Sequence, residues 1–252
     1  MNEIPQEIQD WFEKIVKENL AISKGAARDK VLYKAKHTGL VMMTGKKIVE
    51  NSPEFKWNKK QAMVICLLHD VGRFPQVLLN SYSDINTGID HASLGLKMIA
   101  EQNFNWKEWE MDGEVIFEAI KWHNQKDYLG DNLYAKFIRD ADKNALFGDY
   151  KELEDYVFFE KEKSTRINEK IWEKLEKRES IGNEMIISSA EGIINYASWL
   201  WNLNLKYSRK LAIESKIIEN LLKSLKKNGN GSEDVKRLEK NLEDFRLFAT
   251  TI

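Results

Sequence analysis

The chain has 252 residues, of which 42% are hydrophobic and 31% are charged, and its formal net charge is −1. This length and apolar content suffice for one large domain, or for one domain with an appendage. The near balance of charges argues against a protein that binds nucleic acid through bulk electrostatics, and the single cysteine, Cys66, excludes an internal disulfide.

The amino end, MNEIPQEIQDWFEKIV, is acidic and amphipathic and lacks the pattern of a secretory signal. No run approaches the roughly 18 apolar residues that a membrane span needs. We therefore expect a soluble, cytoplasmic protein that binds neither nucleic acid nor a membrane.

Apolar residues recur at intervals of three and four along most of the chain, which is the period of a helix. In residues 7–20 the repeat is formed by Ile8, Trp11, Phe12 and Ile15. With only 3 prolines the helical segments run long, and no segment alternates with the period of a strand, so we predict an all-α protein built as a helical bundle. Further helices are expected at 29–50, 59–71, 91–102, 112–125 and 131–148.

Two regions complete the predicted organisation. Residues 80–90, NSYSDINTGID, are polar and turn-forming, so we expect a loop there that includes Asp84 and Asp90. Residues 193–225 form one nearly continuous amphipathic pattern in the second half of the chain. We predict a metal-binding helical core at 1–150 and a helical extension at 151–252 that packs on it as one compact unit and suits a homodimer interface.

The first half of the chain also holds all four of its histidines, each on or at the end of an expected helix. The stretch LLHDVGRFPQ, 67–76, ends an apolar run with His69 and Asp70, and burying such groups without partners costs several kcal/mol. A metal ion is one way to satisfy them. Imidazole nitrogen and carboxylate oxygen together suit Mn, Fe, Co, Ni or Zn, and ligands from several helices converge in known bundle-core metal sites.

The segment RDADK, 139–143, adds two carboxylates of which only one can face inward, because residues two apart on a helix point about 200° apart. Asp142 shares its stripe with apolar Ile138 and Leu146, which favours it as the ligand. Asp140 shares its stripe with polar residues and stays the alternative, as a surface or supporting group.

At these residues the sequence resembles the HD-domain superfamily of metal-dependent phosphohydrolases over roughly residues 25–150. The resemblance implies an all-α core and one or two divalent transition-metal ions. It places His37 in HTGLV, His69 and Asp70 in LLHDVGRF, and Asp142 in RDADK around the main ion. It also implies a second ion at His91 in DHASLG and His123 in KWHN, bridged to the first by Asp70.

The resemblance implies hydrolysis of a small phosphorylated substrate by a metal-bound hydroxide, with Asp70 and Arg73 as catalytic residues. After His123 the chain reads HNQKDYLGDN, without the Gly-Tyr-Pro of relatives that cleave cyclic di-GMP. The run HDVGRF lacks the acidic pair of relatives that cleave guanosine tetraphosphate. With these two substrates disfavoured, we expect a phosphomonoester or a nucleotide-like molecule as the substrate.

Contacts to that substrate are predicted from cations and amides near the ligands. Arg73 suits a planar clamp on phosphate oxygens, and a surface ion pair is the alternative. Asn124, Lys143 and Lys34 are further candidates for phosphate or leaving-group contacts, for which a solvated helix face is the alternative.

Two other functions use the same residues. Some relatives in the superfamily are di-iron oxygenases with four histidines and two aspartates, so the ligand set alone does not distinguish that chemistry. A non-catalytic nucleotide-binding or sensor module is the third hypothesis. Phosphate chemistry is favoured because Arg73 and the nearby cations suit it.

Overall fold

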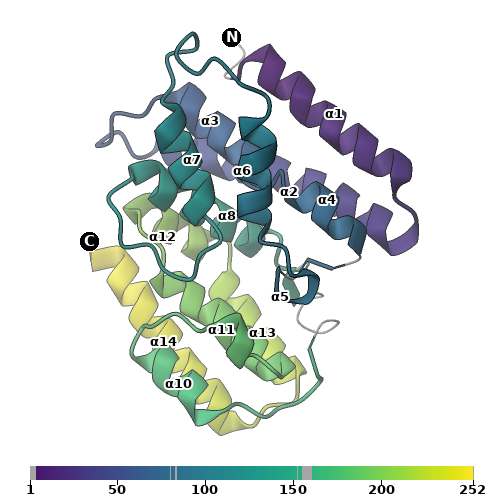
Figure 1. Cartoon of the computed structure of the whole chain (residues 1–252). Helices are drawn as coiled ribbons and strands as arrows, with labels where there is room; N and C mark the ends of the chain where they lie inside the picture. Colours follow the sequence, from purple (N-terminus) through teal and green to yellow (C-terminus); the bar gives the residue numbers. More distant parts are fainter. Residues whose placement is uncertain (1–3, 80, 83, 152, 155–160, 252) are drawn as a thin grey trace. The chain divides into compact units, whose positions relative to one another are not determined.

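The structure is a computed structural model that describes residues 4–79, 81–82, 84–151, 153–154 and 161–251. Its ordered elements are helices, and within these residues β-structure is limited to one isolated bridge between Glu162 and Ser188, which confirms the all-α class. The chain divides into two compact units, Met1–Asp142 and Lys143–Ile252 (Figure 1). The border lies inside helix α8 (Leu133–Gly148), whereas residue 150 was expected. Packing of the extension on the core stays a prediction.

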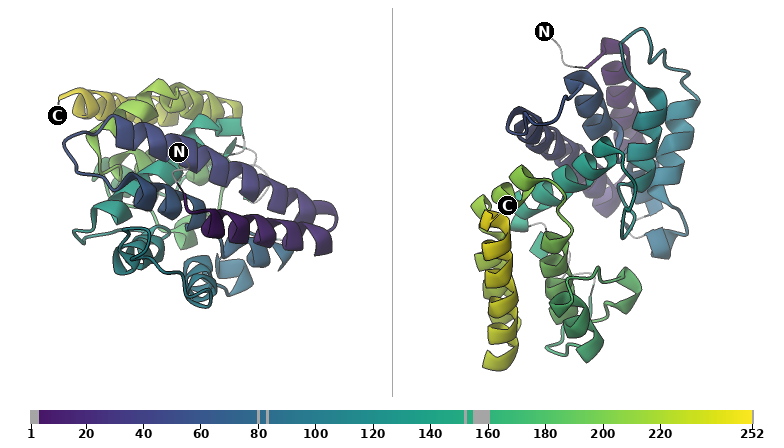
Figure 2. Two further views of the ribbon diagram at one scale, coloured as in Figure 1. Left: turned by 90° about the horizontal axis from the view of Figure 1, so that it is seen from above. Right: turned by 90° about the vertical axis from the view of Figure 1, so that its left-hand side faces the viewer.

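The first unit begins with two long helices, α1 (Gln6–Ile22) and α2 (Gly25–Glu50), which lie side by side (Figure 2). The predicted helices of this unit are all present, with ends shifted by a few residues. After α2 come α3 (Lys59–Leu68), α4 (Arg73–Gln76), the 3-10 turn η1 (Val77–Leu79), α5 (Asp84–Thr87), α6 (His91–Ala100), α7 (Gly113–Trp122) and α8.

Helix α3 is the core helix of this unit. Every residue from Gln61 to Leu68 is buried, and α1, α2 and α7 pack against the helix. A helix that is apolar on all sides belongs inside a protein, because no face of it is suited to water. Its end at Leu68 therefore delivers His69 and Asp70 into the interior.

The apolar character of this region bears on the membrane prediction. By mean hydropathy, Lys59–Leu79 is long and apolar enough to cross a membrane, which was not expected of any segment from the sequence. However, 78% of its most apolar window is buried inside the structure, and the segment is divided among α3, α4 and η1. Burial to this extent is typical of a segment in the core of a protein.

A close backbone contact brings α6 against the turn that follows α3. A Cβ atom added to Gly72 would lie only 2.1 Å from the carbonyl oxygen of His91 and 2.6 Å from the amide nitrogen of Gly95. Only a residue without a side chain fits at this position. Gly72 thus allows the amino end of α6, with His91 as its first residue, to reach Asp70.

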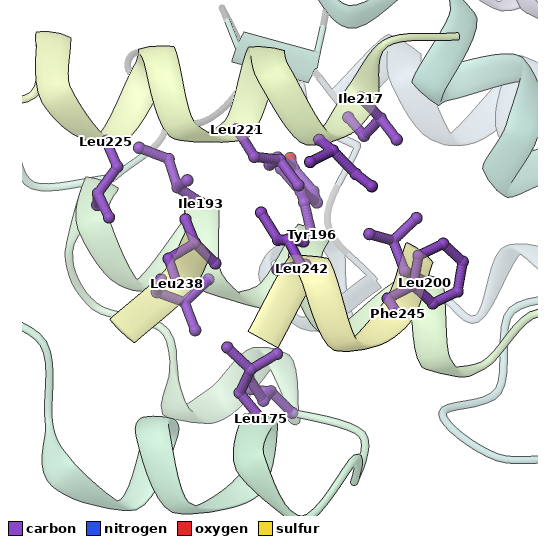
Figure 3. Packing of buried hydrophobic residues seen from close by; sticks show 14 of the residues in the cluster. Leu175, Ile193, Tyr196, Leu200, Ile217, Leu221, Leu225, Leu238, Leu242 and Phe245 are labelled. Carbon is purple, nitrogen blue, oxygen red and sulfur yellow. The ribbon is translucent and has the colours of Figure 1, made fainter. Parts of the chain in front are cut away.

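The second unit has its own apolar core (Figure 3). Leu175 of α10 (Glu169–Glu176), Ile193 and Leu200 of α11 (Ser189–Trp201), Leu221 of α13 (Ile217–Lys227) and Leu242 of α14 (Ser232–Thr251) all contribute to it. Two further elements of the unit are η2 (Asn183–Met185) and α12 (Lys206–Glu214).

The nearly continuous amphipathic pattern of residues 193–225 is divided among three helices in the structure. Helix α11 ends at Trp201, α12 ends at Glu214, and α13 begins at Ile217. Lys216 adopts a left-handed backbone with φ of 61°, which interrupts a right-handed helix. The side chain of Arg209 donates hydrogen bonds to the carbonyl oxygens of Leu203 and Asn204, which stabilises the earlier break.

Candidate metal centre

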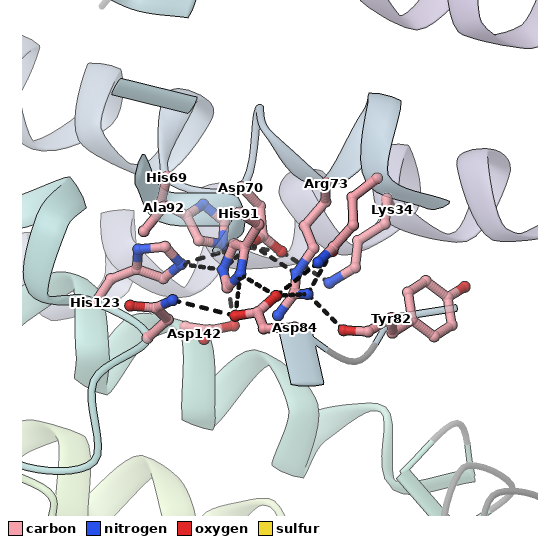
Figure 4. Close-up of polar contacts among 12 residues, drawn as sticks. Lys34, His69, Asp70, Arg73, Tyr82, Asp84, His91, Ala92, His123 and Asp142 are labelled. Atoms are coloured by element: carbon pink, nitrogen blue, oxygen red, sulfur yellow. Dashed lines mark hydrogen bonds and ion pairs between the residues drawn. The ribbon is translucent and has the colours of Figure 1, made fainter. Parts of the chain in front are cut away.

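The six side chains predicted as metal ligands lie together in the first unit. His37 comes from α2, His69 and Asp70 follow α3, His91 begins α6, His123 follows α7, and Asp142 belongs to α8. None of the four histidines is more than 5% exposed, and neither is Asp70. Figure 4 shows that the imidazoles of His69, His91 and His123 gather around the carboxylates of Asp70 and Asp142.

Asp70 lies between two groups of histidines, and its carboxylate is close to both. Its Oδ1 atom is 3.2 Å from Nε2 of His91 and 3.5 Å from Nε2 of His123, while Oδ2 is 3.7 Å from Nε2 of His69. Among the described residues, three sets of side chains have candidate ligand atoms within 4.8 Å of one another, and two of these sets contain Asp70. We call these two the His37 triad (His37, His69 and Asp70) and the His123 triad (Asp70, His91 and His123); the third set is Asp84, Asp90 and His91.

Asp142 joins the His37 triad, because its Oδ1 atom is 2.8 Å from Nε2 of His37 and 4.0 Å from Nε2 of His69. The reason given for choosing it over Asp140 was wrong. Asp140 is fully buried, not a surface group, whereas the side chain of Asp142 is 25% exposed. Helix α8 is packed on its polar side as well, as the buried Asn144 shows, so burial did not distinguish the two carboxylates.

The hydrogen bonds of three imidazoles leave Nε2 as their ligand atom. Nδ1 of His69 is 2.8 Å from the carbonyl oxygen of Cys66, and Nδ1 of His123 is 2.6 Å from that of Ile120. Nδ1 of His91 lies 2.8 Å from a carboxylate oxygen of Asp84. Since these partners only accept hydrogen bonds, each Nδ1 carries a proton, and Nε2 is the nitrogen that each ring turns to the centre.

A cation fits this arrangement on two independent grounds. Nε2 of His69 is buried without a hydrogen-bond partner, although a buried polar atom is normally satisfied. Nε2 of His91 and Nε2 of His123 lie 3.0 Å apart, so two nitrogen lone pairs face each other unless a proton or a metal ion lies between them. Nitrogen and carboxylate oxygen donors match a divalent transition metal.

The electrostatics of the site favour the ligand forms of its side chains. Burial lowers the pKa of His69 to about 4, outweighing the carboxylates of Asp70 and Asp142, so the imidazole is neutral near pH 7. Burial acts to raise the pKa of Asp70, but the charge of Lys34 and the neighbouring imidazoles hold it well below its usual value. The pKa of Asp142 is likewise lowered against the effect of burial, chiefly by the hydrogen bond with His37.

Asp84 supports the site, although the sequence analysis placed it in a loop. It lies in the short helix α5, and both of its carboxylate oxygens are within 2.9 Å of Nδ1 of His91. Gln76 also donates a hydrogen bond to it, at 2.7 Å. Carboxylates in this position orient a histidine ligand and raise its basicity. No periodicity or motif in the polar segment 80–90 distinguishes Asp84 from Asp90.

Arg73 holds this supporting carboxylate. Its terminal NH1 group lies 2.7 Å from Asp84, 2.6 Å from the side-chain oxygen of Gln76 and 2.5 Å from the carbonyl oxygen of Tyr82. The Nε atom is 3.7 Å from Oδ1 of Asp70. The guanidinium thus lies beside the ligands, and its role as a phosphate clamp stays a prediction.

The other predicted substrate contacts differ in their surroundings. The amide of Asn124 donates hydrogen bonds to Asp90 at 2.8 Å and to Asp84 at 3.4 Å, which places it among the supporting groups. Lys143 directly follows Asp142 on α8 and is half-buried. Nζ of Lys34 lies 2.8 Å from Oδ2 of Asp70. Substrate binding by these residues stays a prediction.

Fold and site together define a helical protein with a buried His–Asp centre fit for a metal ion. Residues 35–146 match the family model of the HD domain, and all six predicted ligands lie within this range. Residues 35–146 therefore form an HD domain, which confirms the resemblance to the HD-domain superfamily of metal-dependent phosphohydrolases. Comparisons with curated proteins and with solved structures gave no match.

Proposed function

We propose that this protein is a metal-dependent phosphohydrolase that acts on a phosphomonoester or a nucleotide. The observation that carries the proposal is the position of Asp70, whose two oxygens face two different histidine groups while Lys34 and Arg73 lie beside it. Ligands for one or two ions and cations for an anionic substrate are thereby gathered at one point.

Different residues of the chain would have different roles at such a site. The imidazoles of His69 and His123 face the centre through Nε2, and their backbone hydrogen bonds fix the orientation of the rings. Lys34 and Arg73 supply positive charge for phosphate oxygens. A bound divalent ion would supply a water of lowered pKa and neutralise charge on the phosphoryl group.

The test begins with protein purified without added metal, whose metal content is measured before any assay. The metal-free protein is then loaded in turn with manganese, cobalt, nickel, zinc or iron and offered a panel of phosphomonoesters and nucleotides. We expect hydrolysis with at least one ion. Asp70→Asn is expected to lose at least about a hundredfold in kcat/KM, because one substitution disturbs both histidine groups.

The matched control is Asp131→Asn, whose carboxylate is fully exposed at the surface. It removes the same charge and is expected to keep wild-type turnover. Two iron ions per chain with oxygen consumption, and no phosphate release, would refute the proposal in favour of an oxygenase. Tight nucleotide binding without turnover under every ion would refute it in favour of a binding module.

A further inference from the structure

Arg139 is a buried arginine on α8 that the proposed chemistry does not use. It is only 3% exposed, and burial lowers the pKa of its guanidinium. Keeping such a cation away from water is costly unless its donors are satisfied. Its partners therefore indicate what the residue does.

The hydrogen-bond partners of the guanidinium are backbone carbonyl groups of Trp122, the last residue of α7, and of the segment that directly follows it. NH1 of Arg139 lies 2.8 Å from the carbonyl oxygen of Trp122 and 2.5 Å from that of Gln125, and NH2 lies 3.0 Å from that of Lys126. Carbonyl groups at the carboxyl end of a helix carry partial negative charge and lack partners within the helix. The planar guanidinium thus binds the turn that ends α7.

The turn that Arg139 binds contains His123. Trp122 is the residue before it, and Nδ1 of His123 donates to the carbonyl oxygen of Ile120 in the same turn. The imidazole is therefore tied to the backbone at the end of α7. Its Nε2 atom lies 3.0 Å from Nε2 of His91 and 3.5 Å from Asp70, so a small shift of the turn would open the His123 triad.

Helix α8 links this turn to the other group of ligands. Asp142, which contacts His37, lies three residues after Arg139 on α8, and residues three apart share one side of a helix. One helix thus supplies a carboxylate to the His37 triad and holds the turn that carries His123.

We infer that Arg139 is the positioning residue of the His123 triad, and that this triad needs Arg139 to hold a metal ion while the His37 triad does not. The inference rests on the proposed metal centre. It is independent of the reaction, since it concerns the number and affinity of bound ions.

The test is a titration of metal-free protein with cobalt(II), followed by absorption spectroscopy and calorimetry. Wild-type protein is expected to bind two ions per chain. Arg139→Met is expected to bind one ion with wild-type affinity and to lose the second, as His123→Ala does. The double variant should lose nothing further, because both substitutions remove the same site.

Arg139→Lys keeps the charge but not the planar fork, and it is expected to bind the second ion at least about tenfold more weakly. This variant keeps the test decisive if Arg139→Met does not fold, with folding followed by circular dichroism. Arg28→Met is the matched control, because NH1 of Arg28 donates to the carbonyl oxygen of Leu20 at the end of α1. The control should bind two ions as wild type does.

Three results would overturn the inference: wild-type binding of a single ion, unchanged binding of both ions by Arg139→Lys, or an equal loss of both ions. If only the proposed function fails, no phosphate is released, but wild type and the variants still bind the expected numbers of cobalt ions. The two failures are therefore distinguishable.

Discussion

Replacing Lys34 by methionine should lower the stability of the metal-free protein and raise its affinity for a metal ion. Nζ of Lys34 is 2.8 Å from Oδ2 of Asp70, and the two side chains are 12% and 7% exposed. At that distance, and with an effective dielectric constant of about 20, the attraction is about 6 kcal/mol before desolvation is subtracted. Removing one partner of a buried pair typically costs about 3–5 kcal/mol, because the other charge is left uncompensated.

We therefore expect Lys34→Met to lower the stability of the metal-free protein by about 3–5 kcal/mol. In the same variant the affinity for cobalt(II) should rise, because an ion bound by Asp70 no longer shares that carboxylate with an ammonium group. Denaturant unfolding with chelator and with saturating cobalt measures both effects, and the stabilisation by metal should be larger in the variant than in wild type.

Lys30→Met is the control for this experiment. Nζ of Lys30 lies 5.3 Å from the centre of the Tyr82 ring, and Nζ of Lys34 lies 5.5 Å from it, so the two lysines share this neighbour. Lys30→Met should leave cobalt affinity unchanged. An equal loss of stability with and without metal in Lys34→Met would refute the reasoning, since it would reduce Lys34 to a packing role.

Three further predictions concern the support of the site and the independence of the second unit. Gly72→Ala should weaken metal binding and lower the melting temperature, because its Cβ would lie 2.1 Å from the carbonyl oxygen of His91; an unchanged metal titration would contradict this. Asp84→Asn should weaken binding at the His123 triad by about 10–100-fold in calorimetry, as loss of a group that orients a histidine ligand does elsewhere. Leu221→Ala should cost about 2–5 kcal/mol in denaturant unfolding and leave the cobalt stoichiometry of the first unit as in wild type, because Leu221 is fully buried in the other core.

The order of the helices, and the positions along them of the candidate ligands, could be predicted because both depend on local signals. The apolar period located the longer helices of the first unit, and the His-Asp pair at the end of an apolar run located the centre of the site. Asp142 was also predicted, but on an argument from helix faces that the burial of Asp140 contradicts. Choosing a ligand by helix face assumes that the polar face of the helix is exposed to solvent. On α8, Asp140 and Asn144 of the polar face are buried.

The supporting residues could not be predicted in the same way. Asp84 reaches His91 from a polar segment without periodicity, and Arg139 reaches the end of α7 from a different helix. Such contacts depend on how helices pack, which the sequence of one segment does not encode. The breaks between α11, α12 and α13 were missed because apolar spacing continues across Leu203 and Lys216 while the backbone does not.

The termination of α3 and α7 at the same place has a consequence for the order of ligand entry. His69 and His123 each follow the last residue of a helix, so two helix ends direct their partial negative charge at one point. Around that point the carboxylates of Asp70, Asp84, Asp90 and Asp142 outnumber the cations Lys34, Arg73 and Arg139. An anion arriving first would meet an unfavourable field, whereas a cation would be drawn in, so phosphate should associate only after the ion is seated.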